Sequence, residues 1–319
     1  MYRLSLILIA ALLAATTPVI GQDWPQRPVK IIVPYAPGGN TDAIARITAE
    51  RLTTALNQQV IVENRAGAGG ATAADFVAKA PADGYTLFVA ALSQFGPVPL
   101  TQKVNYDPLK DVTPIANIGA NGFVIAVHPG LPVSDLKGFV DHVKARPGKL
   151  NYGSGGTGSL TPLAALLFLN RAGLDMVHVA YKGGAPALAD TLSGQVQMYA
   201  GSPSELLQHA AAGKIKLLGI TSDRRNAQLP NVPAIAEIYP GFKAMTWNGL
   251  LAPAGLPPAI TTRLAGEMQK LMKDAVFLDR LAKLGLDPVP TTPASFASDI
   301  RSEYAMWRDL IKSTGVVVE

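Results

Sequence analysis

The sequence contains no cysteine, and only 16% of its 319 residues are charged. Without cysteine, the chain forms no disulfide, carries no lipid on a thiol behind an export signal, and offers no thiolate for catalysis or metal binding. After residue 21 it also lacks an apolar run of the ~20 residues that a membrane-spanning helix needs. These absences predict a protein that folds by burying a core, without cross-links or a second anchor.

The usual catalytic motifs are missing as well. No serine lies in a G-x-S-x-G elbow, and no glycine-rich loop ends in the G-K-[ST] of a phosphate-binding loop. A HExxH metal helix is absent, because the histidines are scattered at positions 128, 142, 178 and 209. His178 alternates with Val177 and Val179, which predicts a strand and a structural role for this histidine. The pattern counts against hydrolase chemistry and predicts no metal site.

Basic charge is modest and dispersed. The formal net charge is +5, and no basic run is longer than Arg224-Arg225. Proteins that bind nucleic acid gather lysine and arginine into a stripe or patch. We therefore expect no nucleic-acid partner.

The N-terminus reads as an export signal. Arg3 gives a positive start, residues 4–15 are apolar, and Val19-x-Gly21 supplies small residues before a cleavage site after about Gly21. The apolar stretch is shorter than a membrane span, so removal is favoured over the alternative, an uncleaved anchor. We expect residues 1–21 to be a signal peptide and the mature protein to be a soluble, periplasmic monomer.

The remaining residues alternate between strand and helix patterns almost throughout. Such alternation predicts an α/β fold with largely parallel sheets, and a chain of this length normally forms two domains. No linker, repeat or low-complexity segment interrupts the pattern.

A first glycine turn lies within residues 30–42 (KIIVPYAPGGNTD). Residues 31–33 form an apolar strand, Gly38-Gly39 allow a tight turn, and Asn40 or Thr41 is suited to cap a following helix with Ile44, Ile47, Leu52 and Leu56 on one side. A helix start of this kind points backbone N–H groups and a positive dipole end at one spot, which suits an anion. No lysine or arginine lies inside the turn, so uncharged donors would hold the ligand.

A second glycine turn, residues 153–159, also ends a strand and opens a helix about a hundred residues later, and Ser202 starts a third helix. In open α/β sheets, ligands lie beyond the carboxyl ends of strands. If the two turns belong to different domains, they face one cleft; the alternative is that all three are ordinary connections.

Seven segments carry a family resemblance through their order and spacing: WPQRPVKIIVPYAPGGNTD (24–42), VENRAGAGG (62–70), DGYTL (83–87), YDPLKD (106–111), PGKLNYGSGGTGS (147–159), VHVAYKGGAPAL (177–188) and LAPAGLP (251–257). The chain resembles the Bug family of periplasmic solute-binding proteins, the receptors associated with tripartite tricarboxylate transporters. The resemblance implies two doubly wound α/β domains joined by crossing hinge strands, the type II periplasmic binding protein fold with Venus-flytrap closure. The domains would hold residues 22–122 with 249–319, and residues 123–248.

The resemblance also implies a function and a site. The protein would capture a small carboxylate-bearing organic acid for a tripartite uptake system with membrane subunits, or for sensing, without catalysis or a cofactor. Asp42 would support the first turn. Tyr181-Lys182 end a strand near the cleft, and Lys182 is the one candidate cation, with a solvated strand end as its alternative. The implied ligand-binding residues are Tyr35, Gly38, Gly39, Asn40, Thr41, Ser93, Gln94, Ser154, Thr157, Gly158, Ser159, Tyr181, Ser202 and Trp247, the last with hinge core as its alternative.

Two segments depart from the family pattern. Leu160-Thr161-Pro162 follow the second turn where many relatives carry a polar run with histidine, and Asn248 follows Trp247 where an aromatic or apolar residue is common. These departures bear on the part of the site that reads the non-carboxylate end of the ligand.

An exported oxidoreductase is the alternative function. Gly153, Gly155 and Gly158 match the dinucleotide fingerprint G-x-G-x-x-G. The preceding strand is poorly apolar, however, and the following strand ends in Tyr181-Lys182 instead of the acidic residue that holds a ribose. We therefore expect a receptor and no nucleotide cofactor.

Overall fold

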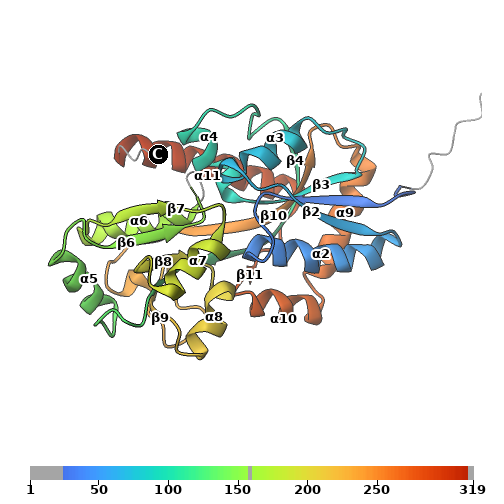
Figure 1. The fold of residues 1–319 in the computed structure, drawn as a ribbon. Coiled ribbons are helices and arrows are strands. Elements are labelled where there is room, and N and C mark those ends of the chain that lie inside the picture. Colours follow the sequence, from blue (N-terminus) through green and yellow to red (C-terminus); the bar gives the residue numbers. More distant parts are fainter. Residues whose placement is uncertain (1–23, 157–159, 315–319) are drawn as a thin grey trace, which may run out of the picture.

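The computed structural model describes residues 24–156 and 160–314, and its strands form two separate sheets (Figure 1). The first sheet has the strand order β11-β4-β10-β3-β1-β2, built from β1 (Val29–Val33), β2 (Val60–Asn64), β3 (Thr86–Ala91), β4 (Val112–Gly122), β10 (Met245–Pro253) and β11 (Asp287–Pro288). The second has the order β7-β6-β8-β5-β9, built from β5 (Val124–Val127), β6 (Asn151–Ser154), β7 (Val177–Ala180), β8 (Met198–Gly201) and β9 (Lys216–Ile220).

Helices pack around both sheets, and we call each sheet with its helices a lobe. The first lobe carries α2 (Asn40–Leu56), α3 (Ala71–Ala78), α4 (Pro97–Thr101), α9 (Pro258–Leu271), α10 (Ala275–Lys283) and α11 (Pro293–Thr314). The second lobe carries α5 (Leu136–Lys144), α6 (Leu160–Ala172), α7 (Gly184–Ser193) and α8 (Pro203–Ala211). Short 3-10 turns lie at η1 (Ala68–Gly70), η2 (Leu92–Phe95) and η3 (Ile235–Glu237). The predicted two-sheet α/β architecture is confirmed.

The predicted helix after the first glycine turn is α2. Its apolar side, Ile44, Ile47, Leu52 and Leu56, is buried against the first sheet, and the helix ends at Asn57, which adopts the left-handed conformation. The predicted N-cap was wrong by one position. Gly39 is the N-cap, with extended backbone and no capping side chain, because Asn40 and Thr41 turn their side chains to other partners.

The expectation of largely parallel sheets was wrong. Each sheet has a parallel part (β2-β1-β3 and β7-β6-β8), but β10 runs antiparallel to β3 and β4, and β5 runs antiparallel to β8 and β9. The reason is the path of the chain. It leaves the first lobe through β4 and returns through β10, so these two neighbouring strands must run in opposite directions.

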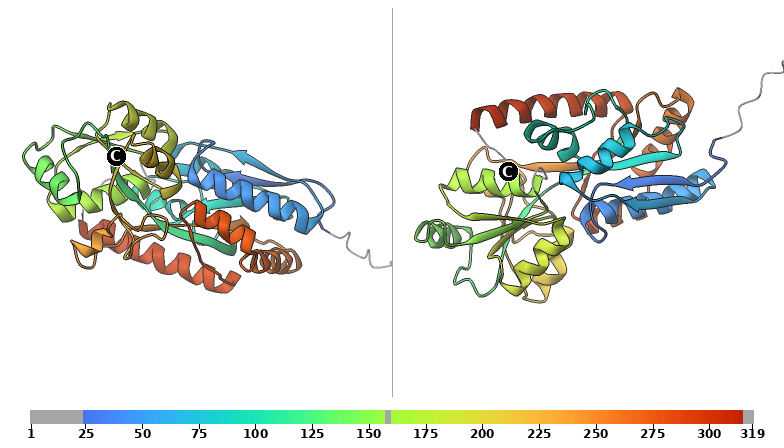
Figure 2. Two further views of the ribbon diagram at one scale, coloured as in Figure 1. Left: turned by 90° about the horizontal axis from the view of Figure 1, so that it is seen from below. Right: turned by 45° about the horizontal axis from the view of Figure 1, so that its top comes forward.

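The crossing segments join the lobes through a continuous core. β4 ends at Gly122, Phe123 links it to β5, and β10 pairs with β4 from Met245 onward (Figure 2). One buried cluster contains Phe88 of the first lobe, Phe139 of the second, and the crossing residues Phe123 and Trp247. The crossing segments, here called the hinge, are therefore packed against both lobes.

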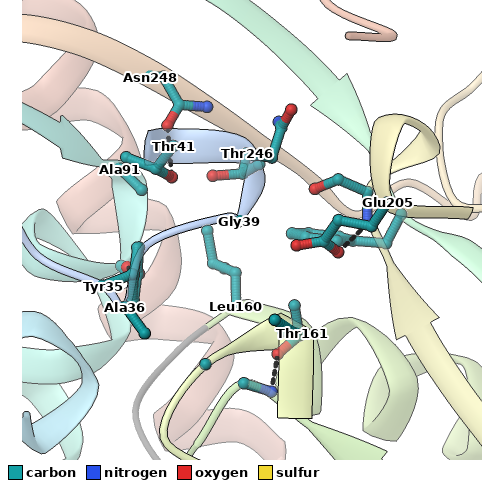
Figure 3. A pocket seen from close by; sticks show the side chains of 18 of the residues that line it. Tyr35, Ala36, Gly39, Thr41, Ala91, Leu160, Thr161, Glu205, Thr246 and Asn248 are labelled. Carbon is teal, nitrogen blue, oxygen red and sulfur yellow. Dashed lines mark hydrogen bonds between the residues drawn. The ribbon is translucent and has the colours of Figure 1, made fainter. Parts of the chain in front are cut away.

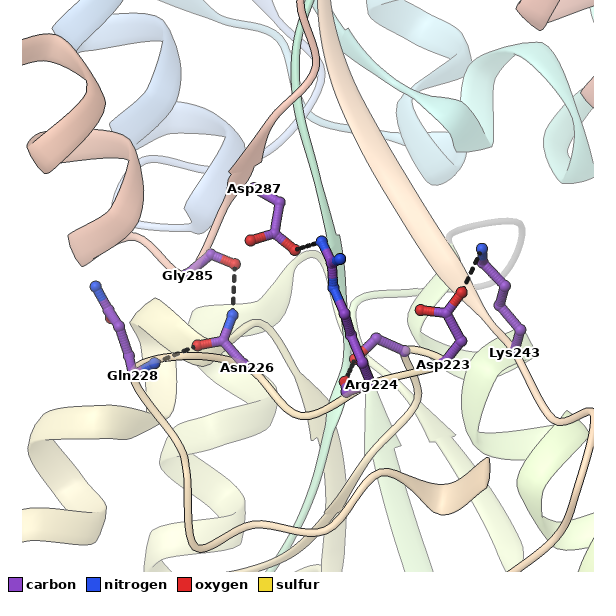
Figure 4. A network of polar contacts seen from close by, with 8 residues as sticks. Asp223, Arg224, Asn226, Gln228, Lys243, Gly285 and Asp287 are labelled. Carbon is purple, nitrogen blue, oxygen red and sulfur yellow. Dashed lines mark hydrogen bonds and ion pairs between the residues drawn. The ribbon is translucent and has the colours of Figure 1, made fainter. Parts of the chain in front are cut away.

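A second set of contacts joins the lobes beside the crossing strands (Figure 4). Asn226 Nδ2 donates to the carbonyl of Gly285 at 3.4 Å, and exposed Arg224 pairs with Asp287 at 3.5 Å. Gly285 has φ +71°, and a Cβ there would lie 2.4 Å from Cβ of Pro203, the first residue of α8. Only glycine permits this approach, which brings the start of α8 against the first lobe.

Candidate functional site

A cavity of about 70 Å³, here called the main cavity, lies between the two lobes at the starts of their helices (Figure 3). The first lobe contributes Tyr35, Gly39, Asn40, Thr41 and Ser93, and the second contributes Ser202, all predicted from the sequence. The cavity therefore contacts the N-terminus of α2 directly. The other lining residues are Ala36, Ala91, Phe123, Gly155, Leu160, Thr161, Gly183, Gly184, Ala185, Tyr199, Glu205, Thr246 and Asn248.

The first glycine turn is held by Asp42. The N–H of Gly38 donates to Asp42 Oδ2 at 3.0 Å, and Arg46 Nε and Asn64 Nδ2 donate to the same carboxylate at 2.9 and 2.8 Å. Burial alone would raise the pKa of Asp42, but these hydrogen bonds hold it below its usual range. Asp42 thus supports the turn, as predicted. Gly38 is exposed, has φ +91° and does not line the main cavity.

Tyr35, Ser93 and Gln94 form one network under the turn. Tyr35 Oη and Ser93 Oγ lie 2.5 Å apart, and Gln94 Nε2 donates to both oxygens and to the carbonyl of Gly69. Burial raises the pKa of the Tyr35 phenol, which keeps it a neutral hydrogen-bonding group. Gln94 is fully buried behind the cavity lining. It therefore positions Tyr35 and Ser93.

The first turn of α2 contacts both the crossing strand and the second lobe. Thr41 Oγ1 donates to Asn248 Oδ1 on β10 at 2.9 Å (Figure 3). Ser204 Oγ on α8 donates to Asn40 Oδ1 at 2.7 Å, and the backbone N–H of Asn40 bonds to the carboxylate of Glu205. The two lobes thus meet at the helix start that the sequence marked as an anion site.

The second glycine turn follows β6. Gly155 N–H donates to Thr161 Oγ1 at 2.8 Å, and Gly156 N–H donates to Ser154 Oγ at 3.2 Å. Ser154 is fully buried outside the cavity lining, and its hydroxyl also bonds His178 Nε2 at 2.7 Å. His178 stacks on Tyr152, which confirms its structural role. The predicted residues Thr157, Gly158 and Ser159 lie outside the described residues.

Tyr181 and Lys182 line a second cavity, here called the side cavity, of about 220 Å³. Its opposite wall is the glycine cluster of residues 66–70, and Tyr35 and Gly155 border both cavities. The Tyr181 hydroxyl donates to Asp190 at 2.6 Å. Tyr181 therefore lies beside the main cavity without lining it.

Trp247 does not line the main cavity. Its ring packs between Phe95 and Phe296, it is 3% exposed, and its indole N–H donates to Glu303 on α11. Side chains alternate along β10, so Thr246 and Asn248 reach the cavity and Trp247 points into the hinge core. Trp247 is therefore part of the hinge core, which was the alternative interpretation from the sequence.

Sequence reasoning missed Glu205, Tyr199 and Thr246. A signal for Glu205 was available, because Ser202-Pro203-Ser204-Glu205 reads as a capping box. Glu205 Oε2 does accept the Ser202 N–H at 3.1 Å, and it also accepts the Tyr199 hydroxyl at 2.8 Å. Nothing in the pattern showed that the same carboxylate faces a cavity.

The chemistry of the main cavity is that of recognition. Its described lining residues include hydroxyls, amides, small apolar groups and one carboxylate, and none is Lys, Arg or His. Within residues 24–156 and 160–314, no cluster of three His, Asp or Glu side chains could hold a metal ion. No helix in the same ranges is long and apolar enough to cross a membrane.

Comparison with known proteins identifies the family of this chain. Residues 44–316 match the model of the tripartite tricarboxylate transporter family receptor. The chain belongs to this family. It is 35% identical over 301 residues to BugT of Bordetella pertussis, which covers 93% of this chain and 92% of BugT. The resemblance to the Bug family is confirmed.

Two solved structures are also similar to this chain in fold and sequence. Rpa4515 of R. palustris with adipate has a TM-score of 0.89 and 32% identity, covering 92% of this chain and 99% of that one. MatC from Rhodopseudomonas palustris with bound malate has a TM-score of 0.85 and 32% identity, covering 90% and 100%. This family member is a solute-binding receptor and not an enzyme. The oxidoreductase alternative gains no support, and the antiparallel β5 in the second sheet also departs from a dinucleotide-binding sheet.

Proposed function

We propose that the protein captures a small organic acid in the main cavity, with a carboxylate held at the N-terminus of α2. The observation that carries this proposal is the opening of a 17-residue helix into a cavity lined by both lobes. Its N-terminal N–H groups and dipole favour a negative charge without a cationic side chain. The adipate and malate of the two R. palustris proteins are carboxylates of this kind.

The two lobes act as domains that close on the ligand. We assign residues 22–122 with 249–319 to one domain and residues 123–248 to the other. The passage of the chain through Phe123 and through β10 supports this division. A ligand favours closure only by its higher affinity for the closed form, so contacts from both lobes are needed.

We further propose that the chain is exported, cleaved after about Gly21 and released as a periplasmic monomer. The membrane subunits of a tripartite tricarboxylate-type transporter are its proposed partners, with sensing as the alternative role. Family membership supports this assignment. Mass spectrometry of the mature N-terminus tests the cleavage, and an intact Met1 in the membrane fraction would contradict it.

The carboxylate role is tested with a thermal-shift screen of organic acids, because a ligand that binds only the folded form raises stability. Calorimetry then compares a binding acid with its methyl ester and amide. We expect the acid to bind at least about tenfold more tightly, a difference of about 1.4 kcal/mol. Equal affinity for the neutral compounds would refute the carboxylate role, and ligand turnover by pure protein would refute the receptor function.

Gly39→Val is the matching variant. A Cβ at Gly39 would lie 3.6 Å from Glu205 Oε1, so a valine side chain fills the space in front of α2. We expect acid binding to weaken at least about tenfold with little change in fold stability. Gly266→Val is the control, because Gly266 on α9 has open space around it and should retain affinity.

A further inference from the structure

Glu205 is the one carboxylate among the described residues that line the main cavity (Figure 3). It lies in the first turn of α8, in the second lobe, and reaches the first turn of α2 in the other lobe through the N–H of Asn40. Its Oε1 is the nearest atom to a Cβ built on Gly39, at 3.6 Å. A ligand carboxylate at the start of α2 would therefore be a direct neighbour of Glu205.

The position of this carboxylate is fixed. Tyr199, which is fully buried, donates to Oε2 at 2.8 Å, and the Ser202 N–H donates to the same oxygen at 3.1 Å. A Cβ on Gly184 would lie only 2.5 Å from Oε1, so the glycine leaves the space that this oxygen occupies. Oε1 is thereby held between Gly39 and Gly184, on the side of the cavity.

The charge of Glu205 has no cationic partner in this lining. The described lining residues contain no Lys, Arg or His, and the groups that favour its charged form are the hydrogen-bond donors Tyr199, Ser202 and Asn40. Burial raises the pKa of Glu205, which reflects the same lack of compensating charge. Two neighbouring carboxylates, one from the ligand and one from Glu205, would repel each other in this site.

We propose that Glu205 determines specificity by binding an ammonium group next to the ligand's carboxylate, so that the cavity favours amino acids over unsubstituted acids. The proposal rests on the proposed function, since it places the ligand's carboxylate at the start of α2. An ammonium group lying between the two carboxylates balances the second negative charge and donates to Oε1. A hydroxyl at the same position donates a hydrogen bond but leaves both negative charges in the cavity.

The cavity volume limits the ligand's size. One water needs roughly 10–15 Å³ of cavity volume, so the 70 Å³ of the main cavity corresponds to about five to seven non-hydrogen atoms. Suitable probes are two series that differ only in the group next to the carboxylate. The series of L-alanine, L-lactate and propionate matches this volume. The series of L-aspartate, L-malate and succinate is slightly larger and adds a second carboxylate.

The experiment measures affinity by calorimetry for both series with the wild type and with E205Q. Glutamine keeps an oxygen that accepts from Ser202 and Tyr199, so the cap of α8 is preserved. In the wild type we expect the amino acid of a series to bind at least about tenfold more tightly than its hydroxy and unsubstituted analogues. In E205Q this preference should disappear, through weaker binding of the amino acid and equal or tighter binding of the unsubstituted acid.

The matched control is E237Q. Glu237 occupies the third position of η3 and accepts the Ala234 N–H at 2.9 Å, as Glu205 does for Ser202, but it pairs with Arg225 on the surface. E237Q should keep the wild-type preference. A wild type that binds the acids of a series alike, or an E205Q variant that still prefers the amino acid, would overturn this proposal and leave the carboxylate receptor intact. The proposed function fails separately, when the amide of a bound acid binds as well as the acid.

Discussion

The two glycine turns look alike in sequence but are supported differently. In the first, the N–H of Gly38 is held by the buried carboxylate of Asp42, which Arg46 and Asn64 hold in turn. In the second, the N–H groups of Gly155 and Gly156 are held by the hydroxyls of Thr161 and Ser154. The first turn thus contains a charged network, and the second is held by neutral groups.

This difference predicts that substitutions destabilise the first glycine turn more than the second. The Asp42 carboxylate accepts three hydrogen bonds, and each hydrogen bond to a charged group contributes about 1.5–3 kcal/mol, whereas a neutral hydrogen bond contributes about 1 kcal/mol. The α2 side of the cavity should therefore tolerate little change. The second turn, held by the hydroxyls of Thr161 and Ser154, can vary at lower cost in stability.

The largest expected effect comes from breaking the first turn. Asp42→Ala removes three hydrogen bonds to one charged group, those from Gly38, Asn64 and Arg46, so we expect a loss of about 3–5 kcal/mol in the free energy of unfolding and no measurable acid binding. Urea unfolding measures the loss. Asp279→Ala is the control, because Asp279 forms an exposed i,i+4 pair with Lys283 and should cost under about 1 kcal/mol. Equal losses in the two variants would remove the proposed difference between the turns.

An intermediate effect concerns β10, the strand through which the chain returns to the first lobe. Trp247 on β10 donates to Glu303, and burial raises the pKa of Glu303 from 4.5 to about 7, with Asp299 raising it further and Lys243 and Trp247 opposing. The folded protein therefore keeps a proton that the unfolded chain releases. The stabilising contribution of this group is complete below pH 4.5 and is lost as the pH rises to about 7.

The change over this interval should be on the order of 3 kcal/mol, and Glu303→Gln should abolish it. Urea unfolding of both proteins at several pH values from 4 to 8 gives the comparison. A wild-type stability that does not fall between these limits, relative to the variant, would show that burial does not raise the pKa of Glu303 in the folded protein.

The smallest expected effect lies at the second turn. Thr161→Val keeps the side-chain shape but removes the acceptor of the Gly155 N–H, so we expect a loss of about 1–2 kcal/mol. Thr161→Ser should restore most of this stability. Chemical denaturation measures both variants, and a loss for Thr161→Val as large as that of Asp42→Ala would contradict the comparison.

Local patterns in the sequence predicted much of the fold. The strand at the first turn, the buried side of α2 and the supporting role of Asp42 all follow from residues close together in the chain. Strand direction did not follow, because it depends on where the chain crosses between lobes. The N-cap also failed, since Asn40 and Thr41 bond to Ser204 and Asn248, which are 164 and 207 residues away.

The site was likewise predictable only where it depends on local sequence patterns. Backbone turns and their neighbours Tyr35, Ser93 and Ser202 were found, because a strand followed by glycine and a helix start marks the cavity edge. Glu205 and Thr246 were not found, because their role depends on how the two lobes meet.

The alternation along β10 has a consequence for how such receptors diversify. Thr246 and Asn248 line the main cavity, which is the proposed ligand site, while Trp247 between them is confined by Phe95 and Phe296. Substitutions at the two outer positions would alter the proposed ligand site, whereas Trp247 between them stays packed in the core that joins the lobes. Under the proposed function, ligand preference can therefore change by single substitutions along one strand while the packed residue between them is retained.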